Sequence, residues 1–243
     1  MLLGGIFLQR IKLSPRLEAI AKLPPSGGSV ADVGTDHGYI PVWLAQNGHS
    51  GALFATDINN EPLSHARQTA AEYGLSDRIK FHLCDGLAAL DGSETDTVII
   101  AGMGGENIAD IIFAAPWVKE KGCLLVLQPM SKSPYLRSWL FDNGFKVLSE
   151  QLVEDGNVYE ILTVRAGKDE PYSPAEHLIG HAPLISNSPL FGRRLNDLIN
   201  KTDRIVKGLS TSTRAEDAER LAEVQEILNS LQELKSGGEP TGK

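Results

Sequence analysis

The residues best suited to chemistry lie in one short stretch, Asp32-Val-Gly-Thr-Asp-His-Gly38. An apolar run stops there at Gly34 and another begins near Gly38, so the pattern predicts a strand, a glycine turn and a helix. Such a turn presents backbone N–H groups to a ligand, and Gly34 lets the backbone approach that ligand closely. Asp32 and Asp36 would repel a pyrophosphate, so the turn favours a cationic or polar nucleoside.

Acidic residues also end the next two predicted strands. Asp57 follows residues 52–56, about 20 residues after Gly34, where an acid can accept both ribose hydroxyls of a nucleoside. Asp85-Gly86 follows residues 79–83, so an acid ends this predicted strand as well. The alternative for Asp85 is a helix cap, and acids often end strands without binding a ligand.

Apolar runs alternate with helical segments from residue 29 to residue 143. This alternation predicts a parallel sheet with helices on both faces. Residues 145–153 and 158–164 then predict an antiparallel hairpin joined by residues 154–157. A dinucleotide-binding fold needs no such ending, whereas the layout resembles the class I methyltransferase fold. The expected class is therefore α/β and Rossmann-like, with a parallel sheet that ends in an antiparallel hairpin.

Four segments are expected along the chain. Residues 1–166 would form a methyltransferase domain, 167–189 a linker or cap, 190–235 a C-terminal helical hairpin or coiled coil, and 236–243 a disordered tail. Apolar seams along residues 195–209 and 221–231 support the hairpin. Thr213 and Glu216 are expected to form a capping box at the start of its second helix.

The turn from Asp32 to Gly38 resembles the first methyltransferase motif, which wraps the methionine part of S-adenosylmethionine. Asp36 occupies the place of the second glycine in the dinucleotide fingerprint G-x-G-x-x-G, which disfavours a nicotinamide cofactor. The fourth strand, residues 97–101, ends in Ala101-Gly-Met-Gly-Gly105. These side chains cannot hydrogen-bond, so we expect an open loop that approaches both methyl donor and a flat acceptor, with Met103 in apolar contact. The alternative is a glycine-rich helix entry without a ligand.

With these motifs the sequence resembles the bacterial tRNA (adenine(22)-N(1))-methyltransferases, which modify an adenine of the D-arm. The resemblance covers about residues 13–165, and the helical tail is similar to that family's appended coiled coil. It implies S-adenosylmethionine as methyl donor and tRNA as acceptor. The matching stretches are Leu13-Ser-Pro-Arg-Leu17, Asp32 to Pro41, Asp85-Gly86-Leu87, Ile100-Ala-Gly-Met-Gly-Gly105, Leu127-Gln-Pro129, Leu136-Arg-Ser-Trp-Leu140 and Val158-Tyr-Glu-Ile161.

The residues expected to bind the cofactor lie at the predicted strand ends and in the first helix: Arg16, Asp32, Gly34, Asp36, His37, Gly38, Asp57, Asp85, Gly86, Ala101, Gly102 and Met103. His37, Met103 and Gln128 are candidates for contact with the target base, and no general base is assigned. N1 of neutral adenine has a free lone pair, so alignment and exclusion of water can suffice. N1 lies on the Watson–Crick edge, so the base must first be extruded.

The net charge of −8 argues against nucleic-acid binding by the whole surface. Residues 193–207 are locally basic and could follow phosphates, although a solvated helix face is the alternative. The basic residues there are Arg193, Arg194, Lys201, Arg204 and Lys207.

No apolar run approaches the roughly 20 residues of a membrane span, and residues 1–8 do not read as a signal peptide. The chain has two cysteines, without a CxxC motif or a Cys/His cluster, so we expect no metal site. A cytoplasmic monomer is expected.

The predicted function is transfer of a methyl group from S-adenosylmethionine to N1 of adenine 22 in tRNA. One alternative is a methyltransferase for another RNA site or a small molecule. Others are a nucleotide-cofactor oxidoreductase and a non-catalytic RNA-binding module with a methyltransferase-like fold. Titration with S-adenosylmethionine against NAD, and methylation assays on tRNA, would distinguish them.

Overall fold

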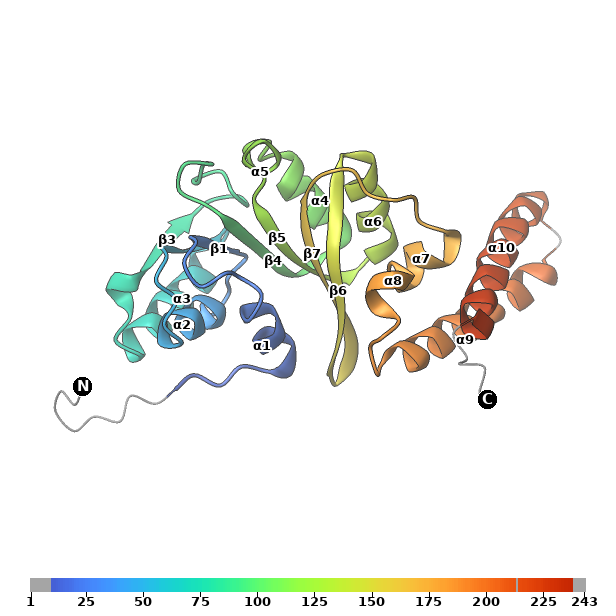
Figure 1. The fold of residues 1–243 in the computed structure, drawn as a ribbon, viewed down its shortest axis with the longest axis horizontal. Coiled ribbons are helices and arrows are strands. Elements are labelled where there is room, and N and C mark those ends of the chain that lie inside the picture. The colour runs from blue at the N-terminus through green and yellow to red at the C-terminus, as the bar shows by residue number, and fades with distance from the viewer. Residues whose placement is uncertain (1–9, 213, 238–243) are drawn as a thin grey trace.

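One seven-stranded sheet organises the chain in the computed structural model, which describes residues 10–212 and 214–237 (Figure 1). The strand order is β3-β2-β1-β4-β5-β7-β6, parallel from β3 to β5 and antiparallel at β7 and β6. The predicted Rossmann-like class is confirmed. The strands are β1 Val30–Val33, β2 Leu53–Asp57, β3 Ile79–Leu83, β4 Thr97–Gly104, β5 Leu124–Ser131, β6 Phe145–Asp155 and β7 Asn157–Ala166.

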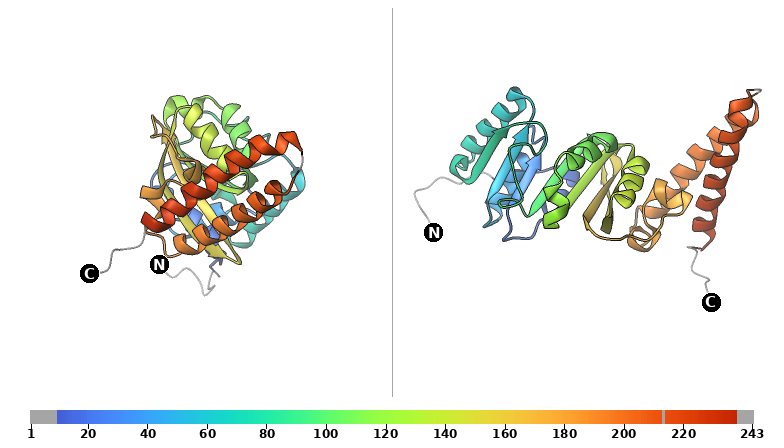
Figure 2. Two further views of the ribbon diagram at one scale, coloured as in Figure 1. Left: turned by 90° about the vertical axis from the view of Figure 1, so that its right-hand side faces the viewer. Right: turned by 90° about the horizontal axis from the view of Figure 1, so that it is seen from above.

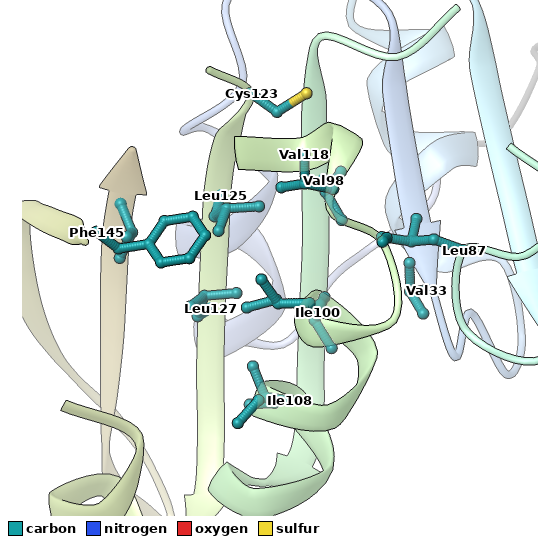
Figure 3. Close-up of a cluster of buried hydrophobic side chains, with 14 of the residues drawn as sticks. Val33, Leu87, Val98, Ile100, Ile108, Val118, Cys123, Leu125, Leu127 and Phe145 are labelled. Atoms are coloured by element: carbon teal, nitrogen blue, oxygen red, sulfur yellow. The ribbon is translucent and has the colours of Figure 1, made fainter. Parts of the chain in front are cut away.

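Helices cover both faces of this sheet because its central strands are apolar on both sides. Val98 and Ile100 of β4 face one apolar core, and Ile99 between them faces the other. Figure 3 shows part of the first core, into which α4, α5 and α6 pack. The second core receives α1, α2 and α3. These helices are α1 Pro15–Ala21, α2 Tyr39–Gln46, α3 Asn60–Glu72, α4 Gly105–Phe113, α5 Trp117–Lys121 and α6 Ser133–Asp142, with a short 3₁₀ helix at Ser76–Arg78.

The structure of residues 102–104 differs from the prediction. We expected the strand to end at residue 101 and open into a loop, but β4 continues through Gly104 beside an equally extended β5. The pairing is irregular around Gly102, whose φ of +81° lies in the left-handed region that a glycine bulge requires. The hairpin is also tighter than predicted, because Asp155 pairs with Asn157 across Gly156 alone.

Residues 167–189 contain two short helices, α7 Pro174–Ile179 and α8 Ala182–Ile185. A capping box formed by Ser173 and Glu176 starts α7. Ala175 and Ile179 of α7 and Ile185 of α8 are fully buried, so this segment packs against its neighbours.

The C-terminal helices α9 Phe191–Ser210 and α10 Ala215–Gly237 pack against each other, which confirms the predicted hairpin. We name these two helices the arm, and Figure 2 shows it extending away from the β6 side of the sheet. Leu198 and Leu231 are buried in it, whereas Ile205, nearer the tip, is 37% exposed. The predicted tail overlaps α10 at residues 236 and 237. The predictions for residues 1–8, Thr213 and residues 238–243 lie outside the described residues.

None of the helices in the described ranges combines the length and apolar character that crossing a bilayer requires.

Candidate functional site

The carboxyl ends of β1, β2 and β4 meet at one edge of the sheet because β1 lies between the other two in parallel pairing. The chain leaves β1 toward β2 on one side and returns to β4 on the other. Such a switch in strand order leaves a crevice where α/β proteins bind ligands. Backbone N–H groups of Gly34 and Thr35 both donate to the Thr56 carbonyl, at 2.9 and 3.0 Å, which fixes the first turn against the end of β2.

Gly34 is required here for two reasons. Its φ of +69° is strained for any residue with a side chain, and an added Cβ would lie 2.2 Å from the Met103 methyl carbon. Met103 therefore packs directly over the first turn. This contact joins two motifs that lie far apart in the sequence.

Gln128 lies beneath the bulge of β4 and is wholly buried. Its Oε1 accepts hydrogen bonds from Arg16 Nη1 at 2.6 Å and from the Gly102 N–H at 3.2 Å, and its Nε2 donates to the Pro129 carbonyl at 2.9 Å. The Arg16 guanidinium also lies over the Tyr159 ring, 5.3 Å from its centroid. The amide of Gln128 is thus fully used inside the protein, so the expected direct contact with a target base is not what this geometry shows.

Two cavities meet at the strand ends, and both are lined by Gly34, Ala101 and Gly102. The larger, about 580 Å³, also contains Asp57, Asp85, Gly86 and Met103 in its wall. The smaller, about 340 Å³, is lined by Arg16, Asp32, Asp36, His37, Tyr39 and Met130, among others. These sizes suit a bound small molecule, and the shared wall allows one ligand to extend from one cavity into the other.

The larger cavity holds both carboxylates predicted to bind a nucleoside. Asp57 is buried at the end of β2, and its Oδ1 accepts the Asn59 N–H at 2.8 Å. Its Oδ2 has no hydrogen-bond partner among the described residues, so this oxygen can accept from a ligand. Asp85 is exposed in the cavity wall, and a turn rather than a helix follows it, so the helix-cap alternative does not hold.

Asp32 is the one buried carboxylate of the smaller cavity's wall within the described chain. Burial raises its pKa to about 6, the Thr35 hydroxyl opposes this by donating to Oδ2 at 2.6 Å, and the nearby charge of Asp57 adds to it. Ionised Asp32 therefore costs free energy in the empty site, and a cationic ligand would offset that cost.

Three aromatic rings stack at the rim of the smaller cavity. His37 lies between Tyr39 and His65, with centroid distances of 5.1 and 5.3 Å. Asp36, His37 and His65 offer ligand atoms that lie within 4.8 Å of one another and could hold a metal ion. An ion shared by both imidazoles must lie in the plane of each ring, so the stacked rings would have to turn to bind it.

The structure thus brings together the cofactor residues that the sequence predicted, from Arg16 to Met103, in the walls of two adjoining cavities or, for Gly38, at the N-cap of α2. It adds His65, Tyr159 and Met130, which the sequence analysis missed. His65 belongs to α3 and Tyr159 to β7, and no local spacing indicated that either would reach the first turn or Arg16. The five basic residues of 193–207 belong to the arm and line neither cavity.

Comparison with known proteins places this site in a family. A methyltransferase-domain family model matches residues 13–162. The tRNA (adenine(22)-N(1))-methyltransferase of Bacillus subtilis (strain 168) is 29% identical over 238 residues, which are 95% of this chain and 100% of the relative. The solved structure of the B. subtilis m1A22 tRNA methyltransferase is 30% identical with a TM-score of 0.80, covering 92% of this chain and 98% of that one.

The chain belongs to the tRNA (adenine(22)-N(1))-methyltransferase family. The resemblance seen in the sequence is therefore confirmed. The match to the family model ends at residue 162, within β7. A Streptococcus pneumoniae relative, solved in complex with S-adenosyl-L-methionine, is 30% identical with a TM-score of 0.75. It covers 89% of this chain and 100% of that one, so the methyltransferase domain and the arm are both within the match.

Asp32→Asn should stabilise the ligand-free methyltransferase above pH 6. Because the fold raises the pKa of Asp32 from 3.8 to about 6, the protonated side chain favours the folded state, and that contribution is lost as the pH rises through 6. An amide keeps the Thr35 hydrogen bond without the charge, so urea unfolding at pH 7.5 should show a gain of up to about 3 kcal/mol. At pH 4 the gain should vanish.

Asp36→Asn is the matched control, since it replaces an exposed carboxylate of the same turn by an amide and should not give a gain of this size at pH 7.5. Equal pH dependence in Asp32→Asn and the parent would contradict the assignment.

Proposed function

We propose that this protein transfers the methyl group of S-adenosylmethionine to N1 of adenine 22 in tRNA. The observation that carries the proposal is the shared wall of Gly34, Ala101 and Gly102 between two cavities. A donor that extends through this wall can present its reactive methyl group beside an acceptor base. The family membership supplies the chemical identity of both partners.

The larger cavity suits the adenosine part of the donor. Asp57 Oδ2, which has no hydrogen-bond partner among the described residues, can accept from the ribose hydroxyls, and Asp85 lines the same cavity. Gly102 has no side chain and nothing lies within 4 Å of where its Cβ would be, so this glycine leaves room for the ligand to pass between the cavities. Arg16, held by Gln128 and Tyr159, offers its guanidinium to the donor's carboxylate at the far end.

Asp32 lies in the wall of the smaller cavity, where its carboxylate can attract a cationic donor. When bound, S-adenosylmethionine supplies a methyl group activated by a sulfonium charge, and its amino group carries a second positive charge. An ionised Asp32 in a buried site interacts strongly with either charge, because the surroundings screen poorly. Ligand binding therefore converts the unfavourable burial of this carboxylate into an attraction.

The smaller cavity suits the acceptor base. Tyr39 and Met130 are exposed at its wall by 40% and 51% and can contact a flat ring, and His37 is stacked on Tyr39 beside them. The N1 lone pair of neutral adenine attacks the methyl carbon while the carbon–sulfur bond electrons go to sulfur. The 1-methyladenine formed is cationic and can lose a proton to water afterwards, so alignment rather than a general base is required.

Two of the three residues predicted to contact the target base have a different role in this proposal. Gln128 fixes Arg16 and the Gly102 N–H instead of binding the base. Met103 packs on Gly34 and lines the larger cavity, so its contact is with the donor. His37 remains at the cavity rim, where it can contact the base or the donor.

The arm offers a surface for the tRNA backbone. Helix α9 contains five basic and two acidic residues, whereas α10 contains two basic and six acidic residues, so α9 is the helix that phosphates would approach. Lys201 and Arg204 are exposed on α9. The other three basic residues are engaged in ion pairs, Arg193 with Glu154, Arg194 with Glu160 and Lys207 with Asp203. We expect the enzyme to act as a monomer in the cytoplasm, with no membrane partner.

Nucleoside mass spectrometry tests the activity directly. Incubation of transcribed tRNA with the protein and methyl-labelled S-adenosylmethionine should yield labelled 1-methyladenosine. The same tRNA with guanine at position 22 should yield none. Label in another nucleoside, or equal label in both tRNAs, would contradict the proposed site of methylation.

Asp57→Ala should weaken the binding of S-adenosylmethionine measured by isothermal titration. The expected loss is at least tenfold in affinity, because a charge-assisted hydrogen bond in a buried site contributes about 1.5–3 kcal/mol. Glu61→Ala, an exposed acid in the first turn of α3, is the control and should bind the donor normally. Unchanged affinity in Asp57→Ala would remove this carboxylate from the donor site.

Lys201→Glu combined with Arg204→Glu should weaken tRNA binding at least tenfold in a filter-binding assay at physiological salt. Both side chains are exposed, so the change should not disturb packing, and affinity for S-adenosylmethionine should stay at the parent value. Glu219→Arg with Glu223→Arg, the opposite change on exposed residues of α10, is the matched comparison. Equal tRNA affinity in the α9 variant and the parent would confine recognition to the methyltransferase domain.

A further inference from the structure

The joint between the arm and the sheet contains a cluster of buried charged residues. On the arm side, α7 belongs with α9 and α10, because Ala175, Ile179, Leu195, Leu198 and Leu231 form one apolar cluster. Helix α7 and the arm therefore form one packed unit, and together with the segment between them, residues 180–190, they are named the arm unit below. What holds this unit on the sheet is a separate question.

On the sheet side, three charged residues are buried together. Arg137 of α6 is 1% exposed, Glu150 of β6 is 5% exposed and Glu160 of β7 is 4% exposed. Arg137 Nη2 donates to Glu150 Oε2 at 3.0 Å and to Glu160 Oε2 at 2.9 Å, and Arg137 Nε donates to Glu150 Oε1 at 3.3 Å. We name these three residues, together with Arg194, the joint cluster.

The arm unit is attached to this cluster at three points. Arg137 Nη1 donates to the His177 carbonyl in the last turn of α7, at 3.0 Å. The His181 N–H, just after α7, donates to Glu150 Oε1 at 3.2 Å. Arg194 of α9 donates to Glu160 Oε1. The three points lie on different parts of the arm unit, so together they restrict its rotation as well as its position.

The charges balance within the cluster, since two arginines face two glutamates. Burial opposes ionisation of Glu160, but the positive charges of Arg137 and Arg194 hold its pKa below the usual value. Replacing such a buried ion cluster by apolar residues often leaves stability unchanged or raises it, so stability does not explain the cluster. Hydrogen bonds depend on direction whereas apolar contacts tolerate sliding, so what the cluster adds is one defined orientation.

We propose that the joint cluster, with Arg194 and Glu160 as positioning residues, sets the angle of the arm so that α9 and the acceptor cavity meet the same tRNA. The role of the arm angle in tRNA positioning rests on the proposed function, whereas the fixed angle itself can be measured without tRNA. Arg194, which the sequence analysis assigned to tRNA phosphates, is 27% exposed in its side chain and is committed to Glu160.

Distance measurements without tRNA test the joint. Spin labels are placed at Glu120→Cys on α5 and Glu223→Cys on α10, both exposed, in a chain with Cys84→Ser and Cys123→Ala. Pulsed electron paramagnetic resonance should give one narrow distance distribution for this parent. Arg194→Met keeps an unbranched apolar stem but removes the guanidinium and its hydrogen bond, and the distribution should widen at least twofold.

Two variants make the result specific. Arg193→Met removes the same charge one residue away, from an ion pair with Glu154 whose side chains are about half exposed, and should leave the distribution narrow. Arg194→Lys should restore it, since lysine can reach the same carboxylate and lacks the Nε–H that is buried without a partner in Arg194. Glu160→Gln is the second disruptive variant if Arg194→Met fails to fold, and should widen the distribution equally.

Kinetics then tests the purpose. Arg194→Met should lower kcat/KM for tRNA at least tenfold, mainly through KM, with unchanged affinity for S-adenosylmethionine, and Arg194→Lys should recover it. A narrow distance distribution in the disruptive variants would contradict the proposal that the joint cluster fixes the arm angle. A wide distribution combined with the parental kcat/KM would contradict the role of that angle in tRNA positioning. A parent that methylates no tRNA would refute the proposed function and leave the distance result intact.

Discussion

The site depends on the parallel pairing of β1 between β2 and β4. This arrangement puts the ends of three strands at one edge, and the Thr56 carbonyl then fixes the first turn by two backbone hydrogen bonds. With the turn held there, Gly34 and Met103 come so close that no side chain fits between them. Gly34, just after β1, and Ala101 and Gly102, in the adjacent β4, form the wall that the two cavities share, and this wall is what allows a donor and an acceptor to meet.

Buried charged residues occur at two places in the described structure, unpaired at Asp32 and paired in the joint cluster. Asp32 has no cationic partner among the described side chains, and its raised pKa records a cost that a cationic ligand can remove. Arg137, Glu150 and Glu160 instead form ion pairs with one another, so they need no ligand as a partner. An unpaired buried charge is suited to binding, whereas a paired group is suited to fixing structure.

Much of the fold could be predicted from the sequence, because β1 and β2 are short, fully buried strands that end at glycine or aspartate, and β3 alternates apolar and polar residues before Asp85. The predicted cofactor residues also follow from strand ends, which the topology brings together without further information. The extension of β4 could not be predicted, since it depends on β5 continuing beside it and on Gln128 accepting the Gly102 N–H.

In the arm too, contacts between residues far apart in the sequence could not be predicted. Arg194 is one of several basic residues on a polar helix, and nothing local distinguishes it from Arg193. Only the packing of α9 beside β7 reveals that one is held by a buried carboxylate and the other by an exposed one. The same holds for His65, which reaches His37 because α3 lies against the first turn.

The β6–β7 hairpin serves the cavity and the arm from adjacent residues. Tyr159 of β7 lies under Arg16, while its neighbour Glu160 binds Arg137 and Arg194, and side chains of successive strand residues point to opposite faces. A slip of β7 by one residue against β6 would exchange the two faces. The single-residue turn at Gly156 therefore helps to fix the register on which both the Arg16–Tyr159 contact and the ion pairs of Glu160 depend.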